Sequence, residues 1–227
     1  MDESDIKVEV LAWIRRASRG RKLPVVTCEF SLNGTGIRAD IALLQGSFYG
    51  IEIKSAADTL KRLARQMEGY ARYFDRTVLV VAPKHLRHLN DIDLKDAQVW
   101  SQSALAEQQL RRRGHRRVIP GNTLLGLLSA DEERRAIRAM SHDDEAPRAQ
   151  PGVDRARTEF EKAFRRRYEP TSSAFWSQVA GRQIRREDLA LLSRFSVDRQ
   201  RLKAAKAAED AHWAGWVANM EATAQAV

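Results

Sequence analysis

The sequence predicts an α/β fold with a mixed central sheet flanked by helices, followed by an α-helical C-terminal region. Three observations favour this class. Strand-like runs occupy residues 25–55 and 77–82, amphipathic helical patterns lie on either side of the first run, and the residues beyond 155 show helical patterns alone. With 227 residues, 43% of them hydrophobic, the chain is long enough to bury a core.

The first elements follow from apolar spacing and from turn residues. A helix is predicted from Ser4 or Asp5 to Ala17, because apolar residues recur there at helical spacing. Asp58 is predicted to cap a helix that ends at Phe74. Between these helices the sequence predicts a meander of three strands, and after them one buried strand, at 25–30, 37–44, 49–55 and 77–82. The expected core order is therefore αβββαβ.

The rest of the chain carries shorter patterns. Short strands are predicted at 97–100 and 117–119, on either side of a helix over 103–113. Proline and scarce apolar residues predict a linker over 141–154, between a domain of residues 1–140 and a basic helical region of residues 155–227. Within that region, helices are predicted at 155–168 and 197–224. The region is either a nucleic-acid-binding module or a helical buttress that packs on the first domain or on a second subunit.

Charge and composition narrow the class of partner. The formal net charge is +9, and both ends of the chain are basic, which is typical of proteins that bind nucleic acid. Residues 1–5 are polar and acidic, unlike a signal peptide, and the apolar runs are too short to span a membrane. Cys28 is the single cysteine, so a disulfide framework is excluded. We expect a cytoplasmic protein, with a second copy as a candidate partner of Trp213 and Trp216.

The second predicted hairpin gathers charged side chains. If Gly46 lies at its tip, Asp40 is opposite Glu52 and Arg38 is opposite Lys54. Side chains alternate between the faces of a strand, so these four side chains are expected on one face of the sheet.

The first predicted hairpin adds a third acid. If residues 33–36 form its turn, Glu29 lies opposite Asp40. Clustered carboxylates repel each other unless a cation joins them, and a few oxygen ligands are typical of Mg²⁺ sites. A metal can activate water and neutralise a phosphate oxygen, and a nearby lysine such as Lys54 can assist. The cluster is therefore suited to phosphodiester hydrolysis.

The segments that carry this cluster resemble a known family. Residues 37–42 (IRADIA) and 50–55 (GIEIKS) precede Gln66 and Tyr70, which have Gln-x-x-x-Tyr spacing. In this order they resemble the core of the PD-(D/E)XK nuclease superfamily, especially its RecB-like branch and small bacterial and phage members of unknown role. Ala39 stands where the family has proline.

The resemblance implies a restriction-endonuclease-like fold and a metal-dependent nuclease. Asp40 and Glu52 would bind Mg²⁺ or Mn²⁺, together with the backbone carbonyl of Ile53. Lys54 would orient or deprotonate the attacking water. Gln66 would lie beside the metal and position the substrate or Lys54.

Further residues are expected around the metal. Glu29 is the first choice for an additional catalytic acid, and Glu9 on the first helix is the alternative. The candidates for contact with nucleic acid are Arg38, Lys61, Arg62, Arg65 and Tyr70. For the basic residues of the second helix, an ordinary solvated helix face is the competing interpretation. For Tyr70 the alternatives are a core residue or a hydrogen-bond partner within the site.

The predicted function is hydrolysis of phosphodiester bonds in DNA by a bacterial or phage-encoded enzyme of repair, recombination or mobile-element biology. RNA is the alternative substrate. Two other functions stay open, namely a catalytically inactive nucleic-acid-binding accessory protein on the same fold and an oligomeric interaction protein.

Overall fold

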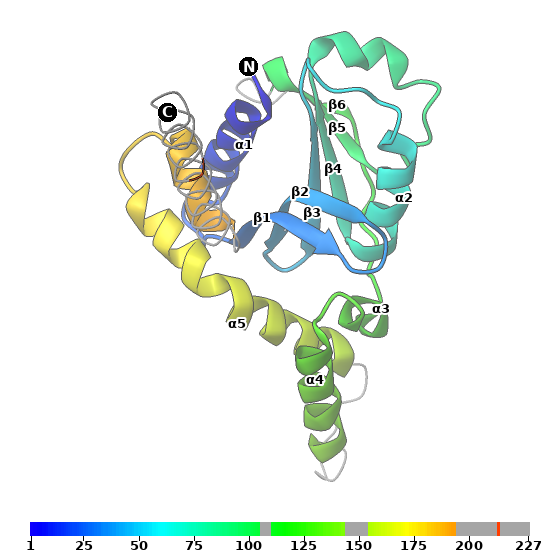
Figure 1. Ribbon diagram of the computed structural model, residues 1–227, viewed down its shortest axis with the longest axis vertical. Coiled ribbons are helices and arrows are strands. Elements are labelled where there is room, and N and C mark those ends of the chain that lie inside the picture. The colour runs from blue at the N-terminus through cyan, green and yellow to red at the C-terminus, as the bar shows by residue number, and fades with distance from the viewer. Residues whose placement is uncertain (105–109, 144–153, 194–212, 214–227) are drawn as a thin grey trace, which may run out of the picture. The chain divides into compact units, whose positions relative to one another are not determined.

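A computed structural model describes residues 1–104, 110–143, 154–193 and Trp213 (Figure 1). Residues 1–192 form one compact unit, to which the following description applies. Its elements are α1 (Glu3–Ala17), β1 (Val25–Leu32), β2 (Ile37–Leu44), β3 (Phe48–Lys54), α2 (Leu63–Tyr73), β4 (Arg76–Val81), η1 (Pro83–His88), β5 (Gln98–Ser101), η2 (Gln102–Ala104), β6 (Leu110–Arg112), α3 (Gly121–Leu125), α4 (Ala130–Asp143), α5 (Arg155–Gln178) and η3 (Arg186–Leu192).

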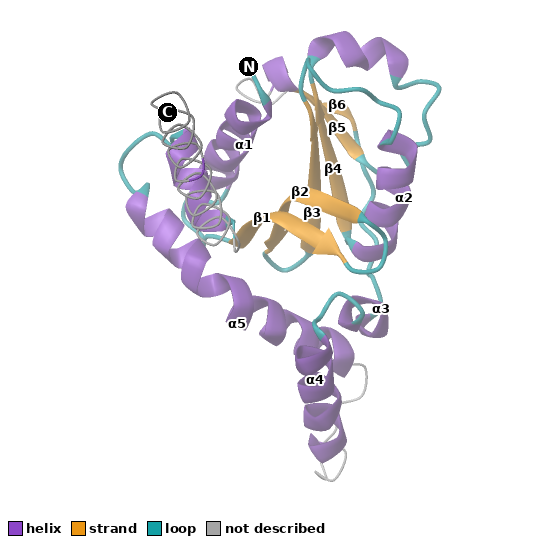
Figure 2. Cartoon of the chain, in the orientation of Figure 1, coloured by secondary structure: helices purple, strands orange, loops and turns teal. Residues whose placement is uncertain are grey.

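The strands form one mixed sheet in the order β1-β2-β3-β4-β5-β6 (Figure 2). β1, β2 and β3 are antiparallel, β4 and β5 continue parallel to β3, and β6 returns antiparallel to β5. The predicted α/β class and the core order αβββαβ are therefore confirmed. No helix of the described residues is long and apolar enough to cross a membrane.

Both predicted hairpin registers are confirmed. Ile41 pairs with Ile51, as a tip at Gly46 requires, and Phe30 pairs with Ala39, as a four-residue first turn requires. Gly46 has a φ of +65°, a left-handed conformation that glycine adopts without the penalty other residues incur.

Helices cover both faces of the sheet. α2 and the first half of α5 pack on one face, and α1 and the second half of α5 pack on the other. Helix α5 therefore crosses the edge of the sheet beside β1 (Figure 1). There, Ser172 accepts a hydrogen bond from the backbone N–H of Val26 at 3.0 Å, and the indole of Trp176 donates to the carbonyl of Pro24 at 2.9 Å. These contacts cover an edge strand that would otherwise be open to pairing.

The second long helix begins later than predicted. The carboxylate of Asp58 accepts hydrogen bonds from both the N–H and the hydroxyl of Ser55, at 2.7 and 2.5 Å. Asp58 therefore closes a tight turn instead of capping a helix, and α2 starts only at Leu63.

The predicted elements after residue 82 need three corrections. The helix expected over 103–113 is wrong, since residues 110–112 form β6, which extends the sheet beside β5. The strand expected over 117–119 is absent from the described residues, because the N–H groups of Arg117 and Ile119 bond to Asp75. The helix expected to end at Tyr168 runs on to Gln178.

The division of the chain differs from the predicted one. Helix α5 shares the core of the sheet, so the compact unit continues to Leu192 and the second unit begins at Ser193. This packing agrees with the buttress interpretation of residues 155–192. Residues 144–153 of the predicted linker, and the predicted last helix apart from Trp213, lie outside the described residues.

One buried carboxylate joins four segments of this unit. Asp75 accepts hydrogen bonds from the N–H groups of Phe48 and Ile119, at 2.7 and 3.0 Å, and from the guanidinium of Arg157. Burial acts to raise the pKa of Asp75, but the hydrogen bonds from Arg157 and the backbone outweigh it and hold the pKa below its ordinary value of 3.8.

We expect Asp75→Asn to lower the free energy of unfolding by about 3 kcal/mol, because it removes the buried carboxylate that binds Arg157 most closely and leaves only the partly exposed Glu161 as its counter-charge. Urea denaturation measures the loss. In the wild type, the stabilisation by Asp75 is complete above pH 3.8 and is lost as the pH falls below it. Asp93→Asn, which removes an exposed pair with Lys95, is the control and should change the free energy of unfolding far less. Equal losses in both variants would contradict the prediction.

Candidate functional site

The candidate site begins where β2 and β3 stop pairing. Their ladder ends at Ile41 and Ile51. At the residue of β2 just before Ile41, the carboxylate of Asp40 accepts a hydrogen bond from the N–H of Ile53 at 2.7 Å. A side chain thus takes the place of a backbone acceptor, and the two strands diverge around it.

The strands β1 and β2 also change faces at this point. Cys28 and Ile41 pack on the face covered by α1, whereas Phe30 and Ala39 pack on the face covered by α2. Residues two apart share a face in a regular strand, so both strands are distorted between these positions. Glu29, at the distortion of β1, has a φ of +59°, which is uncommon for a residue other than glycine.

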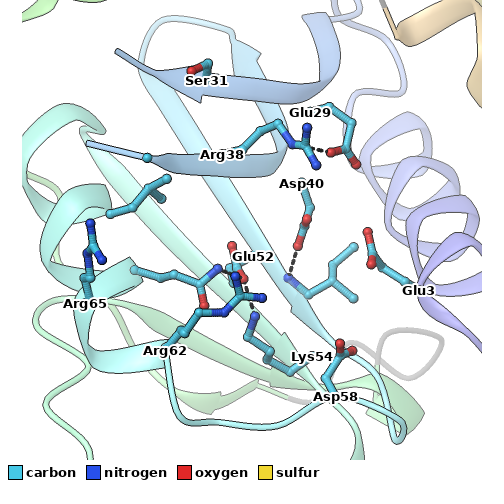
Figure 3. A pocket seen from close by; sticks show the side chains of 14 residues that line it. Glu3, Glu29, Ser31, Arg38, Asp40, Glu52, Lys54, Asp58, Arg62 and Arg65 are labelled. Atoms are coloured by element: carbon cyan, nitrogen blue, oxygen red, sulfur yellow. Dashed lines mark hydrogen bonds and ion pairs between the residues drawn. The ribbon is translucent and has the colours of Figure 1, made fainter. Parts of the chain in front are cut away.

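The divergence leaves a cavity of about 670 Å³ (Figure 3). It is lined by most of the predicted site residues, namely Glu29, Arg38, Asp40, Glu52, Ile53, Lys54, Arg62, Arg65 and Gln66. The charged side chains converge as predicted, but the prediction that they project from a single face of the sheet is wrong. Glu52 bonds to residues of α2 and Glu29 bonds to a residue of α1, so the side chains reach the cavity from both faces of the sheet.

Glu52 is the centre of the hydrogen bonds in this cavity. Its Oε1 accepts from the ammonium of Lys54 and from the amide of Gln66, both at 2.5 Å. Its Oε2 accepts from the hydroxyl of Tyr70 at 2.6 Å. Glu52 is almost fully buried, so these three donors fix the carboxylate in one orientation.

Tyr70 is a hydrogen-bond partner within the site, as one of the predicted alternatives had it, and its burial rules out the predicted contact with nucleic acid. Tyr70 is fully buried beneath the cavity, and its hydroxyl is committed to Glu52. Burial and the negative charge of Glu52 raise the pKa of Tyr70, so the hydroxyl keeps its proton and acts as a donor. Tyr70 is therefore a positioning residue for Glu52.

The acids and neighbouring oxygens suit a hard cation. Burial, and then the negative charge of Glu52, raise the pKa of Asp40 well above its ordinary value, so two carboxylates lie close enough to repel each other. The Oε1 atom of Gln66 is buried and has no hydrogen-bond partner among the described residues. A divalent cation would relieve the repulsion, and oxygen atoms are the ligands Mg²⁺ prefers.

The carbonyl of Ile53 faces the same gap. The carbonyl of Lys54 accepts the N–H of Ala82 at 2.8 Å and so points toward β4. Backbone groups of neighbouring residues in a strand point to opposite sides, so the carbonyl of Ile53 points toward the diverging β2. Asp40, Glu52 and Ile53 could thus present oxygen atoms to one ion.

A second charge cluster lies on the α1 side of the cavity. Carboxylate oxygens of Glu3, Glu29 and Asp40 lie within 4.8 Å of one another. The buried ammonium of Lys7 contacts Glu29 and Glu3, and the guanidinium of Arg38 binds Glu29 at 2.6 Å. Glu29, the predicted extra acid, is therefore already neutralised by two cations, while the alternative residue Glu9 does not line the cavity.

Sequence reasoning missed Glu3 and Lys7. Burial acts to lower the pKa of Lys7, but Asp40, Glu29 and Glu3 outweigh it and hold the pKa above its ordinary value. Lys7 is therefore a resident cation of this cluster. The one sequence signal is the i,i+4 spacing of Glu3 and Lys7, which is common on helices.

The remaining basic candidates differ in position. Arg62 and Arg65 line the exposed rim of the cavity, where Arg65 also donates to the carbonyl of Thr35 at 3.0 Å. Lys61 is exposed but does not line the cavity. Lys61 and Arg62 both precede α2, instead of lying within its first two turns as predicted.

Three comparisons place the chain among known proteins. The profile of the family described as "Bacteriophage P4 protein cII" matches residues 1–193. A relative, "Protein cII" of Enterobacteria phage P4, is 26% identical over 208 residues, which cover 85% of this chain and 78% of the relative. A solved structure of a protein of unknown function from Silicibacter pomeroyi gives a TM-score of 0.42 at 16% identity, covering 66% of this chain and 97% of that one. The family match includes the whole sheet and the cavity.

We expect Lys7→Met to lower the free energy of unfolding by about 2–3 kcal/mol, because three carboxylates lose their shared cation. The cost is below the 3–5 kcal/mol of a fully buried pair because Glu3 is partly exposed. Urea denaturation of a double-mutant cycle with Glu29→Gln measures the coupling, and the double variant should lose less than the sum of the single losses. Lys84→Met, at an exposed lysine, is the control. Additive losses would refute the role of Lys7.

Proposed function

We propose that this chain, which belongs to the Bacteriophage P4 protein cII family, is a metal-dependent nuclease that hydrolyses phosphodiester bonds of DNA. The observation that carries the proposal is the arrangement around Glu52, which brings Asp40, Lys54 and Gln66 together in one cavity. The resemblance of the same segments to PD-(D/E)XK nucleases supports it. Phage DNA repair or recombination in the bacterial cytoplasm is the setting we propose.

The proposed metal is Mg²⁺ or Mn²⁺, held by Asp40, Glu52 and the carbonyl of Ile53. When bound, it would supply a water of lowered pKa and neutralise charge on a phosphate oxygen. The unpartnered Gln66 Oε1 and the mutual repulsion of Asp40 and Glu52 support a cation at this place. Neither Glu29 nor Glu3 is required as a ligand, because Lys7 already contacts both.

The other residues of the cavity would position the attacking water, the Glu52 carboxylate and the substrate phosphates. Lys54 is buried beside Glu52, where its ammonium can hold the attacking water or donate to a phosphate oxygen. Gln66 and Tyr70 keep the Glu52 carboxylate in place. The guanidinium groups at the rim suit contacts with phosphates on either side of the scissile bond.

One observation favours a second candidate, a catalytically inactive nucleic-acid-binding protein on the same fold. Two acids of the cavity already have cationic partners, since Lys54 pairs with Glu52 and Lys7 pairs with Glu29. These pairs lower the repulsion among the acids that a metal would otherwise have to relieve. Cleavage, rather than binding, therefore separates the two functions.

We expect the protein to cut DNA with Mg²⁺ or Mn²⁺ and not in chelator. Asp40→Asn and Lys54→Met should each lower the rate at least about 100-fold, because each removes a group that acts on the transition state. The assay compares single-stranded, duplex, flap and junction DNA with RNA. Lys84→Met, a matched change at an exposed lysine, should cut at the wild-type rate.

The same assay can reject the proposal. Cleavage that persists in chelator, or full activity in folded Asp40→Asn, would refute the metal-dependent mechanism. Binding to DNA without cleavage of any substrate by the wild type would favour the inactive binding protein instead. Circular dichroism of each variant shows whether a lost activity reflects lost structure.

A further inference from the structure

We propose that a second cleft, separate from the cavity at Glu52, binds the phosphodiester backbone of nucleic acid. It lies at the C-terminal end of α1, between the loop that leads to β1 and the turn that follows α5. The inference rests on the nucleic-acid part of the proposed function and does not depend on cleavage.

The charge of this cleft is uniformly positive. It has a volume of about 690 Å³, and the charged side chains among its lining residues are all arginines, namely Arg15, Arg16, Arg19, Arg21 and Arg182. The cavity at Glu52, by contrast, is lined by acids as well as bases. Arg182 is paired with Asp188, but the other four arginines have no acid against them in the described part of the chain, so they repel each other and a bound polyanion relieves that repulsion.

Part of the arginine wall is fixed by the fold. The guanidinium of Arg15 donates to the carbonyls of Val179 and Arg182, at 2.7 and 3.0 Å, and so ties α1 to the turn after α5. Arg182 is itself held by the carboxylate of Asp188, at 2.7 and 2.8 Å. Arg21 donates to the carbonyl of Ala17 at 2.8 Å. The wall is therefore preformed, which lowers the entropic cost of binding.

Two arginines of the cleft remain available to a ligand. Arg16 and Arg19 are exposed, and within the described part of the chain their guanidinium groups have no hydrogen-bond or ion-pair partner. The space beside them is open, because a Cβ added at Gly20 or Gly181 would meet nothing within 4 Å. Guanidinium groups bind phosphate through paired hydrogen bonds, so Arg16 and Arg19 are the expected phosphate contacts.

The position of the cleft fits a nucleic-acid strand better than a small phosphate. Helix α1 carries Glu3, which lines the first cavity, at its N-terminal end, and the arginine cleft lies at its C-terminal end. Its 15 residues span roughly 22 Å at a rise of 1.5 Å per residue. At about 3.4 Å per nucleotide, a strand of about seven nucleotides covers this distance. One strand could then contact both places.

The test compares two double variants with equal loss of charge. Arg16→Gln/Arg19→Gln removes the free arginines of the cleft, and Arg135→Gln/Arg138→Gln removes two exposed arginines of α4 as the control. Affinity for labelled single-stranded DNA of about 20 nucleotides is measured by fluorescence anisotropy at several salt concentrations, in chelator to prevent cutting. Inorganic pyrophosphate is tested as the small-phosphate probe.

We expect the cleft variant to bind DNA about 10-fold more weakly, with the slope of log affinity against log salt reduced by about 1.4, or 0.7 for each lost phosphate contact. The control variant should change affinity less than about 2-fold. Equal losses in the two variants, no loss in the cleft variant, no DNA binding by the wild type, or loss of pyrophosphate binding alone would each overturn the proposal. A wild type that binds DNA through this cleft but never cuts it would refute the nuclease and leave this inference standing.

Discussion

The hydrogen bond between the Ile53 N–H and the Asp40 carboxylate is the contact on which the candidate site depends. A buried N–H needs an acceptor, and in a continuous hairpin a carbonyl of β2 would supply it. Because a side chain supplies it here, β2 is free to diverge from β3 without an unsatisfied donor. The divergence opens the cavity, and it allows Glu52 and Glu29 to approach from opposite faces of the sheet.

The sequence could predict the registers but not this divergence. Turn residues at 33–36 and 45–47 set both hairpins, so the residues that face each other could be counted in advance. The change of face at Glu29 left no signal, because Cys28 and Phe30 are apolar and fit either face. The start of α2 was missed for a related reason, since Asp58 can cap a helix or close a turn and only its bond to Ser55 decides.

Helix α5 could be predicted only in part. Pro170 lies inside it, and proline usually ends or bends a helix, yet the helix continues to Gln178. Its two halves pack on opposite faces of the sheet, with Phe164 in one core and Phe175 in the other. This tertiary packing stabilises a helix that local sequence rules would divide. For the same reason residues 155–192 join the compact unit instead of forming a separate region.

Charge is distributed in two different ways in this unit. Three buried or partly buried acids each contact a cation of the chain: Lys54 at Glu52, Lys7 at Glu29 and Arg157 at Asp75. The arginine cleft lacks such balance, because among its lining residues Arg182 alone has an acidic partner that the structure places against it. Within the described part of the chain, the arginine cleft therefore carries positive charge that no acid balances, whereas the cavity does not. A polyanion attracted to these arginines meets a cavity in which Glu52 and Glu29 are already paired with lysines, which weakens its repulsion of the polyanion.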